Sequence, residues 1–165
     1  AASCAAGAVS AAAGAGGGKV SVVVADGRRP PWSAAAFDRV LVDAPCSGLG
    51  VLRRRPDARW RIRPGDAERL AGLQRELLAA SIPLLRPGGT LVYSVCTLTR
   101  SETLDIDDWL AAEYPRLEPL AVLGPPWRPH GRGSLLLPQS EGTDGMFCLR
   151  LTAGPPAGSS IRLAP

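Results

Sequence analysis

Four cysteines and a single histidine are the residues of this sequence whose types could do nucleophilic or metal chemistry. The cysteines, Cys4, Cys46, Cys96 and Cys148, are irregularly spaced and form no C-x-x-C pair, and the only histidine is His130. This pattern does not predict a zinc site. A cysteine outside a metal site is either a nucleophile, active as its thiolate, or a small buried hydrophobe.

Two of the cysteines follow apolar runs that are typical of strands. Cys46 stands in the turn-like D-A-P-C-S-G at 43–48, after the run FDRVLVD, and Cys96 directly follows the run TLVYSV. Asp26 and Asp43 also stand at the ends of predicted strands. Because the carboxyl ends of parallel strands meet at one edge of a sheet, these four side chains are expected to converge. Cys4 in a low-complexity stretch and Cys148 in an apolar strand are interpreted as structural residues.

The elements that must position these residues alternate between strands and helices. Val-rich and apolar runs predict buried strands, and Leu residues at helical spacing predict a helix that begins with Asp66 as its N-cap and ends near Pro83. Thr99 and Glu102 have the spacing of a capping box, which predicts a second helix as far as about Glu113. The order predicts an α/β fold with a mostly parallel sheet. The predicted strands cover residues 19–26, 37–43, 90–95 and 145–151.

The motifs around the two cysteines resemble those of the RsmB/Sun (NOL/NOP-type) family of RNA cytosine-5 methyltransferases. The family pairs a D-A-P-C-S-G turn with a second cysteine in a Y-S-x-C-[ST] segment about fifty residues later, and the resemblance runs from about Lys19 to Leu151. The matching segments are 43–48, 93–97, Arg55-Pro56-Asp57 with Trp60, L-R-P-G-G at 85–89, L-P at 137–138 and G-T-D-G-M-F at 142–147.

The resemblance implies a Rossmann-like methyltransferase sheet and a covalent mechanism that uses two thiols. Carbon 5 of cytosine becomes nucleophilic when a thiolate adds to carbon 6, and the adduct must later be released. In the family the second cysteine, here Cys96, forms the adduct, and the Pro-Cys residue, here Cys46, assists release. Asp43 would contact the cofactor and the target base, and Asp26 would bind the adenine end of S-adenosyl-L-methionine. The implied partner is RNA, as in the bacterial 16S rRNA enzymes of the family, which act in rRNA processing.

The residues themselves leave other interpretations open. Each cysteine could be a buried hydrophobe, Asp43 a turn-forming residue and Asp26 a strand terminator. A DNA cytosine methyltransferase would use the Pro-Cys thiol as the nucleophile, and the presence of Cys96 in a second motif speaks against that class. A third possibility is an inactive fragment that binds RNA or nothing.

The charge of the sequence is compatible with an RNA partner. The formal net charge is +4, and all of the 19 basic residues except Lys19 are arginines. Guanidinium groups bind phosphate in a bidentate manner, so Arg53 to Arg55 and Arg59 are candidate RNA contacts. A solvated Arg-rich loop is the alternative. These residues belong to a cluster of six arginines between residues 53 and 63.

Composition and spacing also bound the organisation of the chain. No apolar run is long enough to span a bilayer and no signal peptide is evident, which predicts a soluble, cytoplasmic protein, expected to be a monomer without a metal. We expect residues 1–18 to be the remnant of a preceding helix, 19–152 the C-terminal part of a catalytic domain, and 153–165 a frayed tail. Gly16-Gly17-Gly18-Lys19 resembles the family's cofactor loop, but Lys19 and Asp26 are only seven positions apart. The family has some forty or more residues there, so an N-terminally truncated domain is expected.

Overall fold

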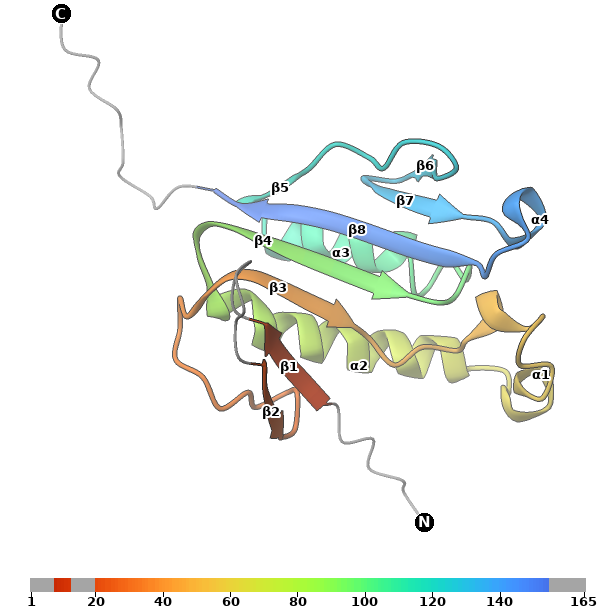
Figure 1. Cartoon of the computed structure of the whole chain (residues 1–165), viewed down its shortest axis with the longest axis horizontal. Coiled ribbons are helices and arrows are strands. Elements are labelled where there is room, and N and C mark those ends of the chain that lie inside the picture. Colours follow the sequence, from red (N-terminus) through yellow and green to blue (C-terminus); the bar gives the residue numbers. More distant parts are fainter. Residues whose placement is uncertain (1–7, 13–19, 155–165) are drawn as a thin grey trace, which may run out of the picture.

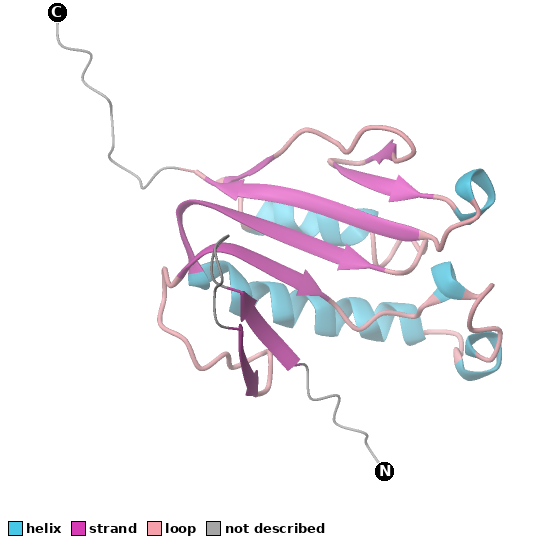
Figure 2. Ribbon diagram, in the orientation of Figure 1, coloured by secondary structure: helices cyan, strands magenta, loops and turns pink. Residues whose placement is uncertain are grey.

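The computed structural model describes residues 8–12 and 20–154, in which two long helices pack against a mixed sheet (Figures 1 and 2). A separate antiparallel pair is formed by β1 (Ala8–Ala12) and β2 (Val20–Val24). The main sheet has the order β3 (Phe37–Asp43), β4 (Leu85–Val95), β8 (Met146–Ala153), β7 (Gly133–Leu136) and β6 (Arg128–His130), with β5 (Leu117–Pro119) also paired to β8. The helices are α1 (Ala58–Arg61), α2 (Asp66–Ser81), α3 (Leu104–Glu113) and α4 (Pro138–Glu141), and 3₁₀ turns occupy Leu49–Val51 and Ile82–Leu84.

The main sheet confirms the α/β class and corrects its expected strand direction. Among the described strands, only β3 and β4 are parallel, joined by the long connection that contains α2. β8 runs antiparallel to β4, to β5 and to β7. Antiparallel neighbours need only short connections, which is how the chain adds β7 and β8 in sequence. The prediction of a mostly parallel sheet is therefore wrong for this part of the chain.

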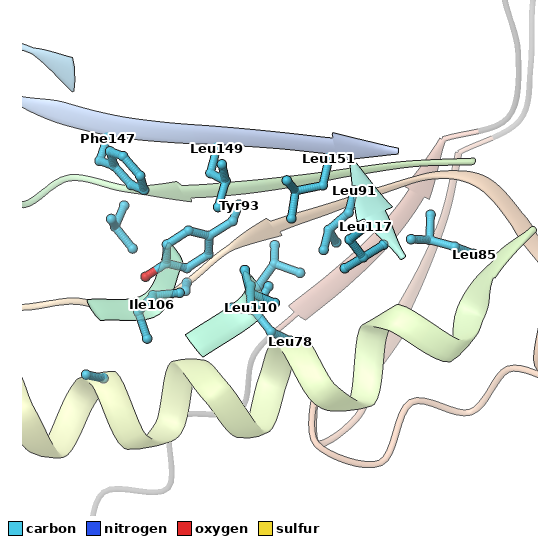
Figure 3. Packing of buried hydrophobic residues seen from close by; sticks show 14 residues of the cluster. Leu78, Leu85, Leu91, Tyr93, Ile106, Leu110, Leu117, Phe147, Leu149 and Leu151 are labelled. Atoms are coloured by element: carbon cyan, nitrogen blue, oxygen red, sulfur yellow. The ribbon is translucent and has the colours of Figure 1, made fainter. Parts of the chain in front are cut away.

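The core lies between one face of the main sheet and the two long helices. Alternate strand residues point toward the helices, as strand geometry requires. Leu78 of α2 and Leu110 of α3 are fully buried against them. Burial of a leucine side chain contributes about 1.5–3 kcal/mol, so this layer fixes how the helices sit on the sheet. The strand side chains in this cluster include Leu91, Tyr93, Phe147, Leu149 and Leu151 (Figure 3).

Two strands that were expected to be buried are buried only in part. Val22 and Val24 of β2 are 72% and 81% exposed, and Leu41 of β3 is 61% exposed. β3 is an edge strand of the main sheet, and its face toward Leu41 carries no described helix. A β-branched or apolar run indicates a strand, but whether the strand is buried depends on which neighbours cover it.

The expected helical remnant at residues 1–18 is wrong where the structure describes it. Residues 8–12 form a strand, and their backbone pairs with β2. Alanine has a high helix propensity, but tertiary context often overrides such propensities. Here the pairing satisfies the N–H and C=O groups that β2 would otherwise present unpaired. Residues 1–7 and 13–18 lie outside the described part of the chain, as do Cys4 and most of the expected tail.

The helix boundaries differ slightly from those expected. The N-cap of α2 is Gly65 in the left-handed region, at φ 85°, and Asp66 is the first helical residue. The helix ends before the 3₁₀ turn that contains Pro83, as predicted. The second helix begins at Leu104 with Thr103 as its N-cap, so Thr99 and Glu102 do not form the predicted capping box at its start. The Glu102 side chain instead accepts from the Ser47 N–H. In the described residues no helix is long and apolar enough to cross a membrane.

Candidate active site

The parallel pairing of β3 and β4 brings the two cysteine segments together. Asp43 and Ser94 are register partners, and the Ala44 N–H donates to the Ser94 carbonyl at 3.0 Å. Both strands therefore end at the same edge, and the chain turns there into the segments that carry Cys46 and Cys96. Their Sγ atoms lie 3.4 Å apart although the residues are 50 positions apart in sequence. The predicted convergence of these two thiols agrees with the structure.

The contact between the thiols gives them different ionisation properties. The hydrogen bond with Cys46 lowers the pKa of Cys96 to about 7, against an opposing effect of burial. The same hydrogen bond and burial raise the pKa of Cys46 well above its usual range. A thiol that donates to a neighbouring thiolate favours the charged form of its partner, and the two groups titrate as a pair. Of the two thiols, Cys96 is therefore the one that ionises, and Cys46 is the donor to it.

Cys96 opens into a pocket of about 420 Å³, a size suited to a small planar ligand. Asp43 lines the same pocket, so the carboxylate at the end of β3 and the thiolate at the end of β4 face one space. Cys46 is not among the lining residues. The full lining is Asp43, Val51, Arg54, Arg55, Cys96, Asp144 and Met146.

The backbone of Gly50 joins segments that carry residues of the pocket. Its N–H donates to the Cys96 carbonyl at 3.0 Å, and its carbonyl accepts from the Gly145 N–H at 2.8 Å. A Cβ at Gly50 would lie 2.1 Å from the Gly145 oxygen and 2.9 Å from the Cys96 oxygen. Only glycine permits this approach, which joins the segment after Cys46 to the Cys96 segment and to the start of β8.

Arginines form one rim of the pocket. Arg54 makes an ion pair with Asp144, which lowers the pKa of that carboxyl group. Arg53 donates to the Gly142 carbonyl. Arg54 and Arg59 are exposed, so both are accessible to a phosphate backbone. The predicted arginine contacts therefore begin at the pocket and continue along the exposed segment into α1.

Asp26 follows β2 and does not line the pocket that Asp43 and Cys96 share. Its carboxylate accepts from the Arg28 backbone and guanidinium, with Oδ2 2.8 Å from Arg28 Nη2, and this contact lowers the pKa of Asp26 to about 2. A Cβ at Gly27 would lie 2.8 Å from Leu77 of α2, so the segment packs closely on that helix.

The described residues fit S-adenosyl-L-methionine only in part. Asp43 faces the pocket with Cys96, whereas the carboxylate of Asp26 is engaged by Arg28. A cofactor that contacts both aspartates would therefore reach outside this pocket. The pocket by itself combines a cysteine thiol of lowered pKa with a carboxylate.

Several functional candidates were not recognised in the sequence. Asp144 and Met146 line the pocket, yet the segment that contains them was noted only as a motif match. Glu102 was interpreted as a helix cap, but it is buried and bonded to the Cys46 turn. The motif match itself was the available signal for the first two, and nothing in the spacing indicated the third.

The structure describes Cys148 but not Cys4, and the search for metal ligands covers only the described residues. Cys148 lies on β8 opposite Ser94 and does not line the pocket, and burial raises its pKa. In residues 8–12 and 20–154 no three His, Cys, Asp or Glu side chains are grouped to hold a metal ion.

Curated proteins are similar to this chain in sequence. A protein of Bacillus subtilis named "Probable ribosomal RNA small subunit methyltransferase B" is 46% identical over 117 residues, which cover 67% of this chain and 26% of that protein. The ribosomal RNA small subunit methyltransferase B of Salmonella paratyphi B is 42% identical over 137 residues, covering 82% of this chain and 31% of the relative. The chain thus spans less than a third of the length of the curated relatives it matches.

Solved structures are similar to this chain in both fold and sequence. PH0851 matches with a TM-score of 0.74 and 31% identity, over 78% of this chain and 30% of that one. NSun6 from Pyrococcus horikoshii, solved with SFG, matches with a TM-score of 0.57 and 32% identity, over 68% of this chain and 29% of that one. Residues 9–152 match the family model for the 16S rRNA methyltransferase RsmB/F. The chain belongs to the RsmB/F methyltransferase family.

Proposed function

We propose that the protein carrying this chain transfers methyl groups from S-adenosyl-L-methionine to carbon 5 of cytosine in RNA, specifically in 16S rRNA, and that Cys96 forms the covalent adduct. The observation that carries the proposal is the thiol pair: Cys96 Sγ lies 3.4 Å from Cys46 Sγ and faces the pocket that Asp43 also lines. The names of the curated relatives support the small-subunit RNA substrate.

The chemistry follows from the different ionisation of the two thiols. The Cys96 thiolate adds to carbon 6, forming the S–C6 bond while the electron pair of the C5–C6 double bond becomes available at carbon 5. The cofactor supplies the methyl group that carbon 5 takes up. A base then removes the carbon 5 proton, the double bond forms again, and the S–C6 bond breaks. Cys46, which holds its proton beside the sulfur of Cys96, assists this release.

Charged groups around the pocket support substrate binding. In this proposal Asp43, which lines the pocket, accepts from the amino group or protonated ring nitrogen of cytosine and stabilises charge that develops after thiolate addition. Arg54, Arg55 and Arg59 contact RNA phosphates in this proposal. Asp26 binds the adenine end of the cofactor in the complete site. Substrate and cofactor are those of a cytoplasmic enzyme, which we propose acts as a monomer.

The proposal predicts cytosine methylation that depends on Cys96. The intact gene product, supplied with labelled S-adenosyl-L-methionine and unmodified 16S rRNA, should produce 5-methylcytosine, detected by mass spectrometry of the digested RNA. Cys96→Ser should abolish turnover, because a hydroxyl ionises far less readily than a thiol. Cys148→Ser is the matched control and should retain activity, since Cys148 does not line the pocket. Methylation by Cys96→Ser at the wild-type rate would exclude Cys96 as the nucleophile.

A second candidate is RNA binding without methyl transfer. It is favoured by the position of Asp26 outside the pocket, where Arg28 engages its carboxylate. RNA binding in a gel-shift assay together with no labelled RNA would support this alternative.

A further inference from the structure

A buried carboxylate lies between the two cysteine-bearing turns. Glu102 is 0% exposed and comes from the segment before α3. Its Oε1 accepts from the Ser47 backbone N–H at 2.8 Å and from Gln74 Nε2 at 3.0 Å. Its Oε2 accepts from the Ser47 hydroxyl at 2.6 Å and from the Thr99 hydroxyl at 2.8 Å. These four donors fill the acceptor positions of the carboxylate.

The partners of Glu102 are the immediate neighbours of the two thiols. Ser47 follows Cys46, and its Oγ lies 2.8 Å from Oγ1 of Thr97, which follows Cys96. The Glu102 carboxylate and this hydroxyl pair therefore connect the two turns next to the residues that carry the sulfur atoms.

The same carboxylate is anchored to α2 and β4. Gln74 Nε2, which donates to Glu102, also donates to the Pro45 carbonyl at 3.0 Å. Tyr93 donates its hydroxyl to Gln74 Oε1 at 2.8 Å. Gln74 and Tyr93 are fully buried, so the network has little freedom to rearrange. A buried carboxylate is costly unless its hydrogen bonds are satisfied, and here its partners are parts of the site.

We propose that Glu102 is a positioning residue that holds the Cys46 and Cys96 turns together, so that the two sulfur atoms remain in contact. Its importance for methyl transfer rests on the proposed function. Its effect on the thiol pair does not, and can be measured without RNA or cofactor.

The test measures how fast iodoacetamide alkylates Cys96 as a function of pH, read by mass spectrometry of the Cys96 peptide from the intact gene product. In the native arrangement the profile should have its midpoint at about pH 7, the pKa that the Cys46 contact gives to Cys96. Glu102→Leu should separate the turns and move the midpoint toward the ordinary thiol value of about 8.5. Ser47→Ala, which keeps the backbone hydrogen bond, should move it part of the way.

The direction of the shift separates positioning from simple electrostatics. Loss of a nearby negative charge would lower the pKa of Cys96, whereas loss of the contact with Cys46 raises it. Glu102→Gln should keep the midpoint near that of the wild type, because its amide oxygen can serve the Ser47 and Gln74 N–H groups and its NH₂ can donate to the two hydroxyls. The other charged groups near Cys96, Asp43, Asp144 and Arg54, are the same in all variants.

Ser134→Ala is the matched control for Ser47→Ala. Both serines are buried, and Ser134 accepts from the Leu123 N–H, in a hydrogen bond that does not involve either cysteine turn. The control should leave the Cys96 midpoint unchanged. If Glu102→Leu fails to fold, Ser47→Ala decides the result.

Two outcomes would overturn the inference. One is a Ser47→Ala midpoint equal to that of Ser134→Ala. The other is that Ser47→Ala still shifts the Cys96 midpoint when it is added to a protein that already carries Cys46→Ala. If the variants shift the midpoint but the wild-type protein fails to methylate RNA, only the proposed function is contradicted.

Discussion

Cys46 and Cys96 are chemically the same residue, and their environment gives them different roles. The contact between their sulfur atoms lowers the pKa of Cys96 and raises that of Cys46. The sequence indicated both thiols and Asp43 because each follows a predictable strand. It could not indicate Glu102, whose bonds reach Ser47 and Gln74, because no local pattern encodes contacts between residues 55 and 28 positions apart.

The pKa of Cys96 predicts how the attack step depends on pH. Because the thiolate is the attacking form and the folded pKa is about 7, single-turnover methyl transfer should fall about tenfold for each pH unit below 7 and level off above it. Cys46→Ala removes the hydrogen bond that favours the thiolate, so its profile should shift upward, toward about pH 8.5. Rapid-quench measurements between pH 5.5 and roughly 9.5 would test both profiles. Identical profiles for the two proteins would show that Cys46 does not tune Cys96.

At the scale of elements, the site depends on two strands ending side by side and on one glycine that connects the segments after them. The bounds of β3 agree with the predicted strand, and β4 and β8 extend beyond theirs. The short strands β5 and β6 were not predicted, because each has only three residues and contains a proline. They are strands because β5 pairs with β8 and β6 with β7, and local sequence propensity does not indicate such pairing.

Gly50→Ala should disrupt the site through the backbone. Its Cβ would lie 2.1 Å from the Gly145 oxygen, so the segments must separate. The expected loss in free energy of unfolding is about 1–3 kcal/mol, together with loss of adduct formation. Gly72→Ala on α2 is the control, since its Cβ meets nothing within 4 Å. It should stabilise the protein by roughly 0.5–1 kcal/mol. Urea unfolding curves compare the two, and equal stabilities would refute the role given to Gly50.

At the scale of the whole molecule, the chain presents a sheet whose helices cover one face and whose β3 edge has no described partner. Sequence pattern predicted the α/β layers but not the strand directions or the separate β1–β2 pair, because both depend on which segments are available to pair. The chain spans less than a third of the length of the matched curated relatives.

The chain alone should bind S-adenosyl-L-methionine weakly or not at all. Asp43 lines the pocket but Asp26 does not, so only part of the proposed cofactor site is assembled. Isothermal titration calorimetry of the 165-residue chain measures this directly. A micromolar dissociation constant would mean that the described residues already contain a sufficient site.

The open β3 edge predicts self-association of the chain. Leu41 is 61% exposed on this strand, and exposed apolar edge strands pair with other chains. Leu41→Lys should reduce association, whereas Val122→Lys, at another exposed apolar position outside the strands, should change it little. Light scattering over a concentration series compares them, and equal association would exclude this edge as the cause.

The most direct test of the central claim is to trap the protein–RNA adduct. Wild type, Cys46→Ala, Cys96→Ala and the double variant are incubated at about pH 8.5, where the Cys96 thiol of either background is substantially ionised, with cofactor and RNA and run on a denaturing gel. Cys46→Ala should accumulate a covalent adduct, because Cys96 attacks and release is impaired. Cys96→Ala and the double variant should form none. An adduct in Cys96→Ala that is absent from Cys46→Ala would contradict the assignment and make Cys46 the nucleophile.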